Sequence, residues 1–388
     1  MKVSFPYMGC VTGYEKLMEL LGHEVIPPHK PTQRTVDLGV LHSPEFICYP
    51  FKVMMGTYIE ACEQGAELIV SSGGSGPCRA GLYGEVHKKT LKQMGYDVDV
   101  VIFDSMFEDF SKFYHQILQI KNKTPLRKVA QYARLVYNMI CQMDELEKEL
   151  KVRRAYEINK DEFNRCWDEI VKLYKGCYNM KDLKAAHKKA WEMFDAVPMR
   201  KVAPEERTRI GIVGEIYVIM ESSTNLDVEQ RLNDMGVEVT NVQYISEWVQ
   251  HNILPRKFNK SESWKMWDKA EQYKSCNCGG HDMENTGRII DFAEKGYDGV
   301  IHLMPFGCLP ELITRSMIPQ LSEELNIPIL SVSMDEQLGE ANLQTRLEAF
   351  VDLCRSKKHE SVHVPENAAQ EQTAKQTTDT HRKKLVTV

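Results

Sequence analysis

Short apolar runs alternate with amphipathic stretches over the first hundred residues of the chain. Apolar and polar positions alternate at the spacing of strands or recur at the spacing of helices. The predicted strands are residues 3–6, 23–26, 67–71 and 97–104, and the predicted helices between them are residues 14–21, 51–63 and 84–94. This alternation is typical of βαβ units that build a parallel sheet.

The strand pattern stops at about residue 106 and returns at residue 208. Helical spacing without strands predicts helices at residues 107–120, 125–150, 161–174 and 181–194. Strand-like runs then recur at residues 208–213, 237–242, 299–304 and 327–332, with helical patterns between them. We therefore predict an α/β protein with a first α/β domain (1–105), a helical insert (106–206) and a second α/β domain (207–355). Residues 356–388 are rich in Thr, Gln and Lys without apolar periodicity, which predicts a disordered tail.

Composition excludes several classes of protein. The 388 residues carry a net charge of −6, and 43% of them are hydrophobic and 27% charged, as in ordinary globular proteins. Wholesale disorder and a generally basic nucleic-acid binder are both excluded on these values. The longest apolar runs end at charged residues far short of the roughly 20 needed to span a bilayer, and the N-terminus lacks a secretory pattern. We expect a cytoplasmic protein that binds neither membrane nor nucleic acid.

The eleven cysteines are the most unusual feature of the composition. Their number is odd and the chain shows no export signal, so metal or cluster ligation, redox chemistry or simple packing explain them better than disulfides do. Cys48 and Cys308 share the pattern F-x-C-x-P, in which Pro precedes a predicted helix and the Cys lies beside the helix N-terminus. Cys78 lies in a glycine-rich turn, where backbone amides, a helix N-terminus and Arg79 should favour the thiolate. That turn fits neither nucleotide-binding fingerprint.

All three cysteines are expected at the carboxyl ends of strands, where open α/β sheets bind ligands, so they could converge. Three thiolates suit an iron–sulfur cluster with one iron left open, and three separately buried loop cysteines are the alternative. Cys10 follows the first strand and is a further candidate ligand. Cys276 and Cys278 resemble half a zinc site without the other half. The five remaining cysteines lie in helical patterns, where packing or solvent exposure explains them: Cys62, Cys141, Cys166, Cys177 and Cys354.

Charged residues at strand ends are candidates for catalysis. Glu215 follows the first strand of the second domain, and Glu336 follows its last strand. Both are expected to face the same crevice, and Arg79 beside Cys78 is a third candidate. For each of them an ordinary solvated side chain is the competing interpretation.

Five segments in order carry a resemblance to a known family. Residues 43–52, 73–84, 211–217, 305–311 and 335–340 together resemble the 2-hydroxyacyl-CoA dehydratase-like superfamily, and more closely its stand-alone activase-related members. The resemblance implies a [4Fe-4S] cluster held by Cys48, Cys78 and Cys308. It also implies a separate ATP-hydrolysing activator that supplies a low-potential electron, with which the dehydratases make a ketyl radical of an acyl-CoA. A related branch holds a double-cubane [8Fe-9S] cluster and reduces small molecules.

These observations together predict a cytoplasmic iron–sulfur protein of anaerobic electron-transfer chemistry, with two Rossmann-like parallel-sheet domains and a helical insert. We expect a dehydratase or ATP-dependent reductase component that forms a homo- or heterodimer. The alternatives are a non-catalytic cluster carrier or assembly subunit, and a zinc-stabilised interaction protein. The extra thiols Cys10, Cys276 and Cys278 leave a double cubane open, although we favour a single [4Fe-4S] cluster.

Overall fold

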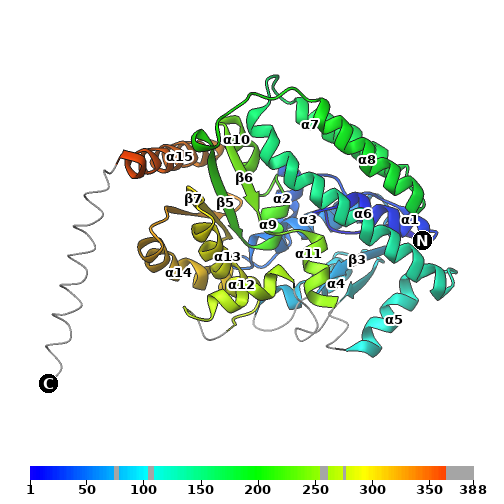
Figure 1. Ribbon diagram of the computed structural model, residues 1–388. Coiled ribbons are helices and arrows are strands. Elements are labelled where there is room, and N and C mark those ends of the chain that lie inside the picture. Colours follow the sequence, from blue (N-terminus) through cyan, green and yellow to red (C-terminus); the bar gives the residue numbers. More distant parts are fainter. Residues whose placement is uncertain (74–77, 104–108, 254–260, 274–276, 364–388) are drawn as a thin grey trace.

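Two four-stranded sheets, each entirely parallel, organise the computed structural model, which describes residues 1–73, 78–103, 109–253, 261–273 and 277–363 (Figure 1). The first sheet has the order β2-β1-β3-β4, with β1 (Lys2–Ser4), β2 (Glu24–Val25), β3 (Leu68–Ser72) and β4 (Asp99–Phe103). The second has the order β6-β5-β7-β8, with β5 (Thr208–Gly214), β6 (Val237–Asn241), β7 (Gly299–Pro305) and β8 (Ile329–Met334). The predicted fold class is therefore confirmed. The strand order of each sheet reverses direction between two neighbouring strands, β1 and β3 in the first sheet and β5 and β7 in the second. Open parallel sheets bind ligands at such a point.

The helices of the first half include one that the sequence patterns did not predict. They are α1 (Val11–Leu20), α2 (Gln33–Leu41), α3 (Tyr49–Glu63) and α4 (Ala80–Gln93). The unpredicted helix is α2, which begins with a capping box between Thr32 and Thr35. Its backbone packs directly against α3, since a Cβ added to Gly56 would lie 1.8 Å from the carbonyl oxygen of Thr35. Only glycine permits this approach.

A layer of helices joins the two sheets. It contains α5 (Phe110–Ile120), α6 (Leu126–Arg153), α7 (Glu162–Lys175) and α8 (Met180–Ala196), with the short 3-10 helices η1 (Arg154–Tyr156) and η2 (Pro204–Glu206). In Figure 1, α6, α7 and α8 lie together along one side of the molecule. Their core is fully buried at Met139, Leu146, Phe163 and Phe194. Helix α6 contacts both α1 and β6, so it braces the two halves. We keep the predicted limits 1–105 and 106–206, and the start of the second α/β domain at residue 207, as a proposed domain division.

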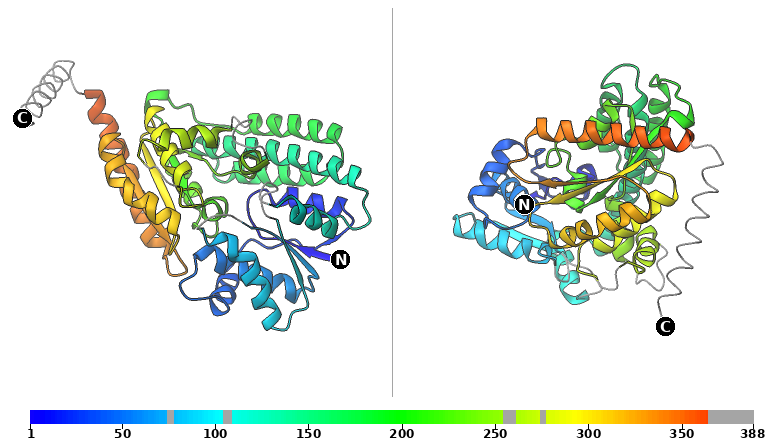
Figure 2. Two further views of the ribbon diagram at one scale, coloured as in Figure 1. Left: turned by 90° about the horizontal axis from the view of Figure 1, so that it is seen from below. Right: turned by 90° about the vertical axis from the view of Figure 1, so that its left-hand side faces the viewer.

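The second half ends in a long helix. Its helices are α9 (Ile216–Met220), α10 (Val228–Asp234), α11 (Ile245–Ile253), α12 (Glu262–Ala270), α13 (Asp282–Glu294), α14 (Leu309–Glu324) and α15 (Glu340–His363). In the left view of Figure 2, α15 lies on the opposite side of the molecule from the N-terminus. The expected start of the tail at residue 356 is too early, because α15 continues to His363. The side chains of Lys357 and Lys358, which lie in this last part of α15, donate hydrogen bonds to the backbone carbonyl oxygens of Asn326 and Arg207.

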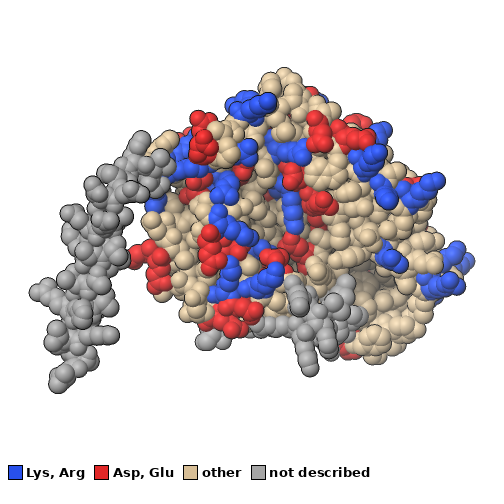
Figure 3. All heavy atoms as spheres, in the orientation of Figure 1, with Lys and Arg blue, Asp and Glu red and all other residues tan. Residues whose placement is uncertain are grey.

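The described surface shows mixed charge. On the face drawn in Figure 3, Lys and Arg side chains are interspersed with Asp and Glu. None of the helices in the described ranges combines the length and apolarity that a bilayer span requires.

Candidate functional site

Cys48 and Cys308 share a local setting, although their helices connect different strands of the two halves, β2 to β3 for Cys48 and β7 to β8 for Cys308. Each is the residue just before a helix, α3 for Cys48 and α14 for Cys308, and a Pro lies within the first two positions of both helices. Both cysteines are buried. The predicted position beside a helix N-terminus is confirmed for both, and it follows from the proline at each helix start.

Arg79 fastens the three cysteine-containing turns to one another. Its guanidinium donates to the carbonyl oxygen of Phe46 at 2.8 Å and to that of Gly307. The thiol of Cys48 also donates to Gly307 O, at 3.6 Å. Gly307 has a φ of +75°, which favours glycine, and lies in the turn before Cys308. Arg79 is therefore bound to two backbone carbonyls, and its suggested catalytic role stays a prediction.

The three thiols lie near one another. The thiol of Cys48 interacts electrostatically with those of Cys78 and Cys308. The turn before α13 borders the same place, because a Cβ added to Gly280 would lie 3.8 Å from the sulfur of Cys78. Residues far apart in the sequence thus meet outside the carboxyl ends of β3 and β7, as open α/β sheets favour.

The electrostatics of these thiols differ from the expectation. Burial raises the pKa of Cys78 and Cys308, and the carboxyl groups of Glu215 and Glu311 raise both further. The backbone N–H of Ala80 lowers the pKa of Cys78 and that of Glu311 lowers the pKa of Cys308, but each offsets only part of the rise. The expected preference for thiolate is wrong because burial outweighs the helix N-termini, and Arg79 is bonded elsewhere. At neutral pH Cys78 and Cys308 hold their protons unless a metal displaces them.

The two candidate carboxylates, Glu215 and Glu336, have different partners. Glu215 precedes α9 and accepts from the backbone N–H of Val218 at 3.0 Å. Burial raises its pKa to about 7 despite that hydrogen bond. Glu336 instead forms a 2.6 Å ion pair with Lys52 of α3. Although burial opposes the change, the hydrogen bond from Lys52 lowers the pKa of Glu336.

A buried polar network behind Cys308 escaped the sequence interpretation. The carboxylate of Glu311 pairs with Nε2 of His302 at 2.8 Å and accepts from Nδ2 of Asn285 at 3.0 Å. Asn285 also donates to the carbonyl of Gly214 at 3.0 Å. The network joins the start of α14 to β5, β7 and α13. The only sequence signal for it is the position of Glu311 three residues after Cys308.

The second-tier cysteines are distributed differently. Cys10 precedes α1 and its thiol lies 3.6 Å from the sulfur of Met143, within the core of the helical layer. The structure does not bring it to the other three thiols. Cys278 is half-buried in the turn that contains Gly280, and its backbone N–H donates to Asp282 at 3.2 Å. Cys276 lies outside the described residues.

The spacing of potential ligands bears on the kind of metal. Among the residues that the structure describes, no three His, Cys, Asp or Glu side chains are grouped to hold one metal ion. Thiolates on a single zinc lie about 3.8 Å apart, given zinc–sulfur bonds of about 2.3 Å. Thiolates on three corners of a cubane lie up to about 7 Å apart. A single zinc ion and a cubane therefore require different separations of the three thiols.

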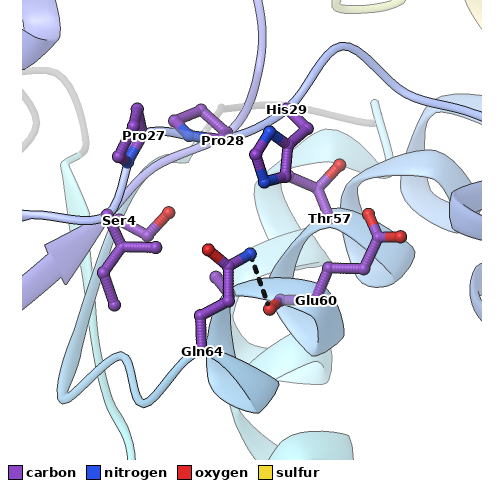
Figure 4. A pocket seen from close by; sticks show the side chains of 9 residues that line it. Ser4, Pro27, Pro28, His29, Thr57, Glu60 and Gln64 are labelled. Carbon is purple, nitrogen blue, oxygen red and sulfur yellow. Dashed lines mark hydrogen bonds between the residues drawn. The ribbon is translucent and has the colours of Figure 1, made fainter.

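Two cavities lie away from these cysteines. One, between β1 and α3, is lined by Ser4, His29, Glu60 and Gln64 and is too narrow for a water-sized molecule (Figure 4). The other, of about 460 Å³, lies between β8 and α15 and is mainly apolar. Neither is lined by Cys48, Cys78 or Cys308.

The fold and the three thiols define a double α/β protein with a candidate cluster site between turns of its two sheets. The family model of the 2-hydroxyglutaryl-CoA dehydratase D-component matches residues 143–353, just over half of the chain. The chain therefore belongs to that family, as the resemblance predicted. The match contains Cys308 and Glu215 but not Cys48 or Cys78. Dehydratase components of this family bind [4Fe-4S] clusters and work with a separate activator. No curated protein matches the sequence.

Proposed function

We propose that this protein is the iron–sulfur component of an ATP-driven dehydratase or reductase system. Cys48, Cys78 and Cys308 would hold a [4Fe-4S] cluster and leave one iron open. The observation that carries the proposal is the meeting of these thiols from three turns that Arg79 fastens together. Family membership supports the same conclusion.

The donor set fits such a cluster. Three thiols are the soft ligands that iron–sulfur clusters take, and burial of two of them excludes water, which favours low-potential chemistry. When bound, the cluster would supply single electrons at low potential to a substrate such as an acyl-CoA. Arg79 would fix the positions of the three cysteine-containing turns relative to one another. The hydrogen bonds of Glu311 would fix the start of α14, which Cys308 precedes. Glu215 can hold or release a proton near neutral pH at its carboxyl group beside the thiols.

Several large apolar side chains close in sequence to Cys48 and Cys308 are exposed to solvent. Phe46 is 73% exposed and Phe306 is 52% exposed, and both stand two residues before a candidate ligand. Leu309 and Leu312 of α14 are exposed beside them. We propose that the ATP-hydrolysing activator docks on this apolar surface, because an electron donor must approach the cluster closely. Polar replacement of Phe46 and Phe306 should then slow ATP-dependent reduction and leave the iron content unchanged.

The ligand set is tested by single replacements. Cys48→Ala, Cys78→Ala and Cys308→Ala should each lose most of the iron after anaerobic purification or reconstitution, measured by iron and sulfide analysis with EPR spectroscopy. Cys141→Ala and Cys166→Ala are the controls, because these cysteines lie on α6 and α7, and they should keep it. Full iron retention in any of the first three variants would remove that residue from the ligand set.

The double cubane is a second candidate because the turn of Cys278 borders Cys78. About eight irons per chain, with loss of iron in Cys278→Ala, would favour it over the single cubane.

The role of ATP separates a catalyst from a carrier. The isolated chain should hydrolyse no ATP, and its cluster should become reduced only with an ATPase reductase that is turning over. Ready reduction by a mild donor without ATP would instead indicate a cluster carrier.

A further inference from the structure

The second sheet ends in an edge strand. In the order β6-β5-β7-β8, β8 has β7 on one side, and no further strand of the described ranges lies on its other side. The carbonyl oxygens of Pro328 and Met334 accept hydrogen bonds from β7 and from the residue after it, at 3.0 and 2.8 Å. Since successive residues of a strand direct their backbone groups to opposite sides, those of Ile329, Ser331 and Ser333 face the uncovered edge.

The cavity of about 460 Å³ is a groove at this edge, between α15 and the end of α14. Leu330 packs with the core beneath α15, whereas Ile329 packs with the core beneath α14, so the two helices cover opposite faces of the sheet. Phe350 and Leu353 of α15 form an apolar wall of the groove. The groove therefore places apolar surface directly beside the edge of β8.

The two polar side chains that line the groove are already bonded to the backbone. Ser322 donates to the carbonyl oxygen of Ile327 at 2.7 Å, and Arg346 donates to that of Ser331 at 2.8 Å. Sites for small molecules present polar groups that fix the ligand. This groove instead offers apolar surface and a strand edge, which together are what an added peptide strand recognises. Proteins commonly cover such edges, because an open edge invites association with other chains.

Residues 385–388, which lie outside the described residues, have the composition of a short strand. Their sequence Leu-Val-Thr-Val is strand-forming, whereas residues 364–384 before them are mostly polar. A basic run, residues 382–384, leads directly into it. Exposed carboxylates, Glu323 and Asp352, are next in sequence to residues that line the groove. The charges beside the groove and beside this segment are therefore complementary.

The length of the linker suits the groove. Phe350 and the end of α15 at His363 lie about 20 Å apart, since a helix rises about 1.5 Å per residue. The sequence predicts no structure for the 21 residues 364–384, and a flexible chain of this length has an r.m.s. end-to-end distance of about 25 Å. Because the two lengths match, the effective concentration of residues 385–388 at the groove is on the order of 1 mM.

We propose that residues 385–388 dock in the groove of the same chain as an added strand beside β8, with their apolar side chains against Phe350 and Leu353. Docking would cover the edge of the second sheet and fasten the end of this sequence to it. A segment that binds with a dissociation constant of only about 0.1 mM would occupy the groove about nine-tenths of the time. The inference is independent of the proposed cluster.

Hydrogen exchange followed by mass spectrometry tests the docking in the full chain. The double variant Leu385→Asp with Val386→Asp should exchange the backbone N–H groups of β8 about tenfold faster than the wild type, because the docked strand protects them about tenfold. Thr377→Asp with Thr378→Asp is the matched control, since it adds the same two charges within the linker. Its exchange at β8 should equal that of the wild type.

Leu353→Asp alters the other side of the contact. The Leu353 side chain is 54% exposed, so the variant should fold, which circular dichroism checks. It should also speed exchange at β8, with no further increase when the tail variant is added, because each change removes the same contact. Leu41→Asp is the control, since Leu41 is 74% exposed on α2.

Three results would overturn the inference. The first is wild-type exchange at β8 in the tail variant, and the second is an equal increase in either control. The third is protection of β8 that rises with protein concentration, which would assign the groove to a second copy of the chain.

Discussion

His87 should make the stability of the folded chain depend on pH in a way that one substitution removes. Its ring is completely buried on α4, stacked on Phe51, with Nε2 3.1 Å from the carbonyl oxygen of Phe51. Nδ1 has no hydrogen-bond partner within the described structure. Burial therefore lowers the pKa of His87 from 6.5 to about 4, despite the hydrogen bond to Phe51.

The sign and size follow from proton linkage. Between pH 6.5 and pH 4 the unfolded chain binds a proton at His87 and the folded chain does not. The stability contributed by the neutral ring is complete above pH 6.5 and is lost as the pH falls toward 4. Between pH 7 and pH 5 this loss amounts to about 2 kcal/mol.

The assay is urea unfolding at pH 7 and pH 5, followed by circular dichroism, for the wild type and His87→Phe. Phenylalanine keeps the stack on Phe51 but cannot be protonated, so the wild type should lose about 2 kcal/mol more than the variant over this interval. Glu215 and Glu221, whose pKa values burial raises to about 7, contribute with the opposite sign. They do so equally in both proteins and cancel in the comparison.

His115→Gln is the matched control for this experiment, because the His115 ring is exposed on α5. It should keep the pH dependence of the wild type. Parallel losses in the wild type and His87→Phe would refute the argument that the buried ring resists protonation.

Three further predictions follow from close contacts. Gly56→Ala should lower the free energy of unfolding, because the added Cβ would meet the carbonyl oxygen of Thr35. This loss is expected even though Ala usually stabilises a helix by about 1 kcal/mol relative to Gly. In denaturant unfolding, Gly339→Ala should show no such loss, because the space around Gly339 is open. Glu336→Gln should cost about 1–3 kcal/mol at pH 7 by leaving the Lys52 ammonium without its carboxylate. Because the pKa of Glu336 is lowered, the pair stabilises the fold above about pH 4.5 and this difference should vanish in acid. Arg79→Met should reduce iron retention measured by iron analysis, while Arg34→Met, which breaks only exposed ion pairs, should not.

The sequence by itself determined the α/β class and most of the elements. The strand predicted at residues 208–213 is β5 (Thr208–Gly214), and the helix predicted at residues 181–194 is α8 (Met180–Ala196). Both patterns depend on which face of a segment is apolar, and the order of residues within that segment determines this face. The prolines after Cys48 and Cys308 likewise marked the two helix starts.

Only the tertiary structure decided the environment of the candidate site. The sequence suggested a thiolate at Cys78, but the protonation of a thiol depends on burial and on Glu215 and Glu311, which come from other elements. Arg79 meets Gly307 across 228 positions of the chain, and no local pattern records that contact. Helix α2, which the sequence patterns do not predict, packs its backbone closely against Gly56 of α3, a contact between two separate helices. Periodicity is a property of residues that are neighbours in the sequence. The protonation of a thiol, its burial and its contacts with other thiols are determined only when distant segments pack together in the folded chain.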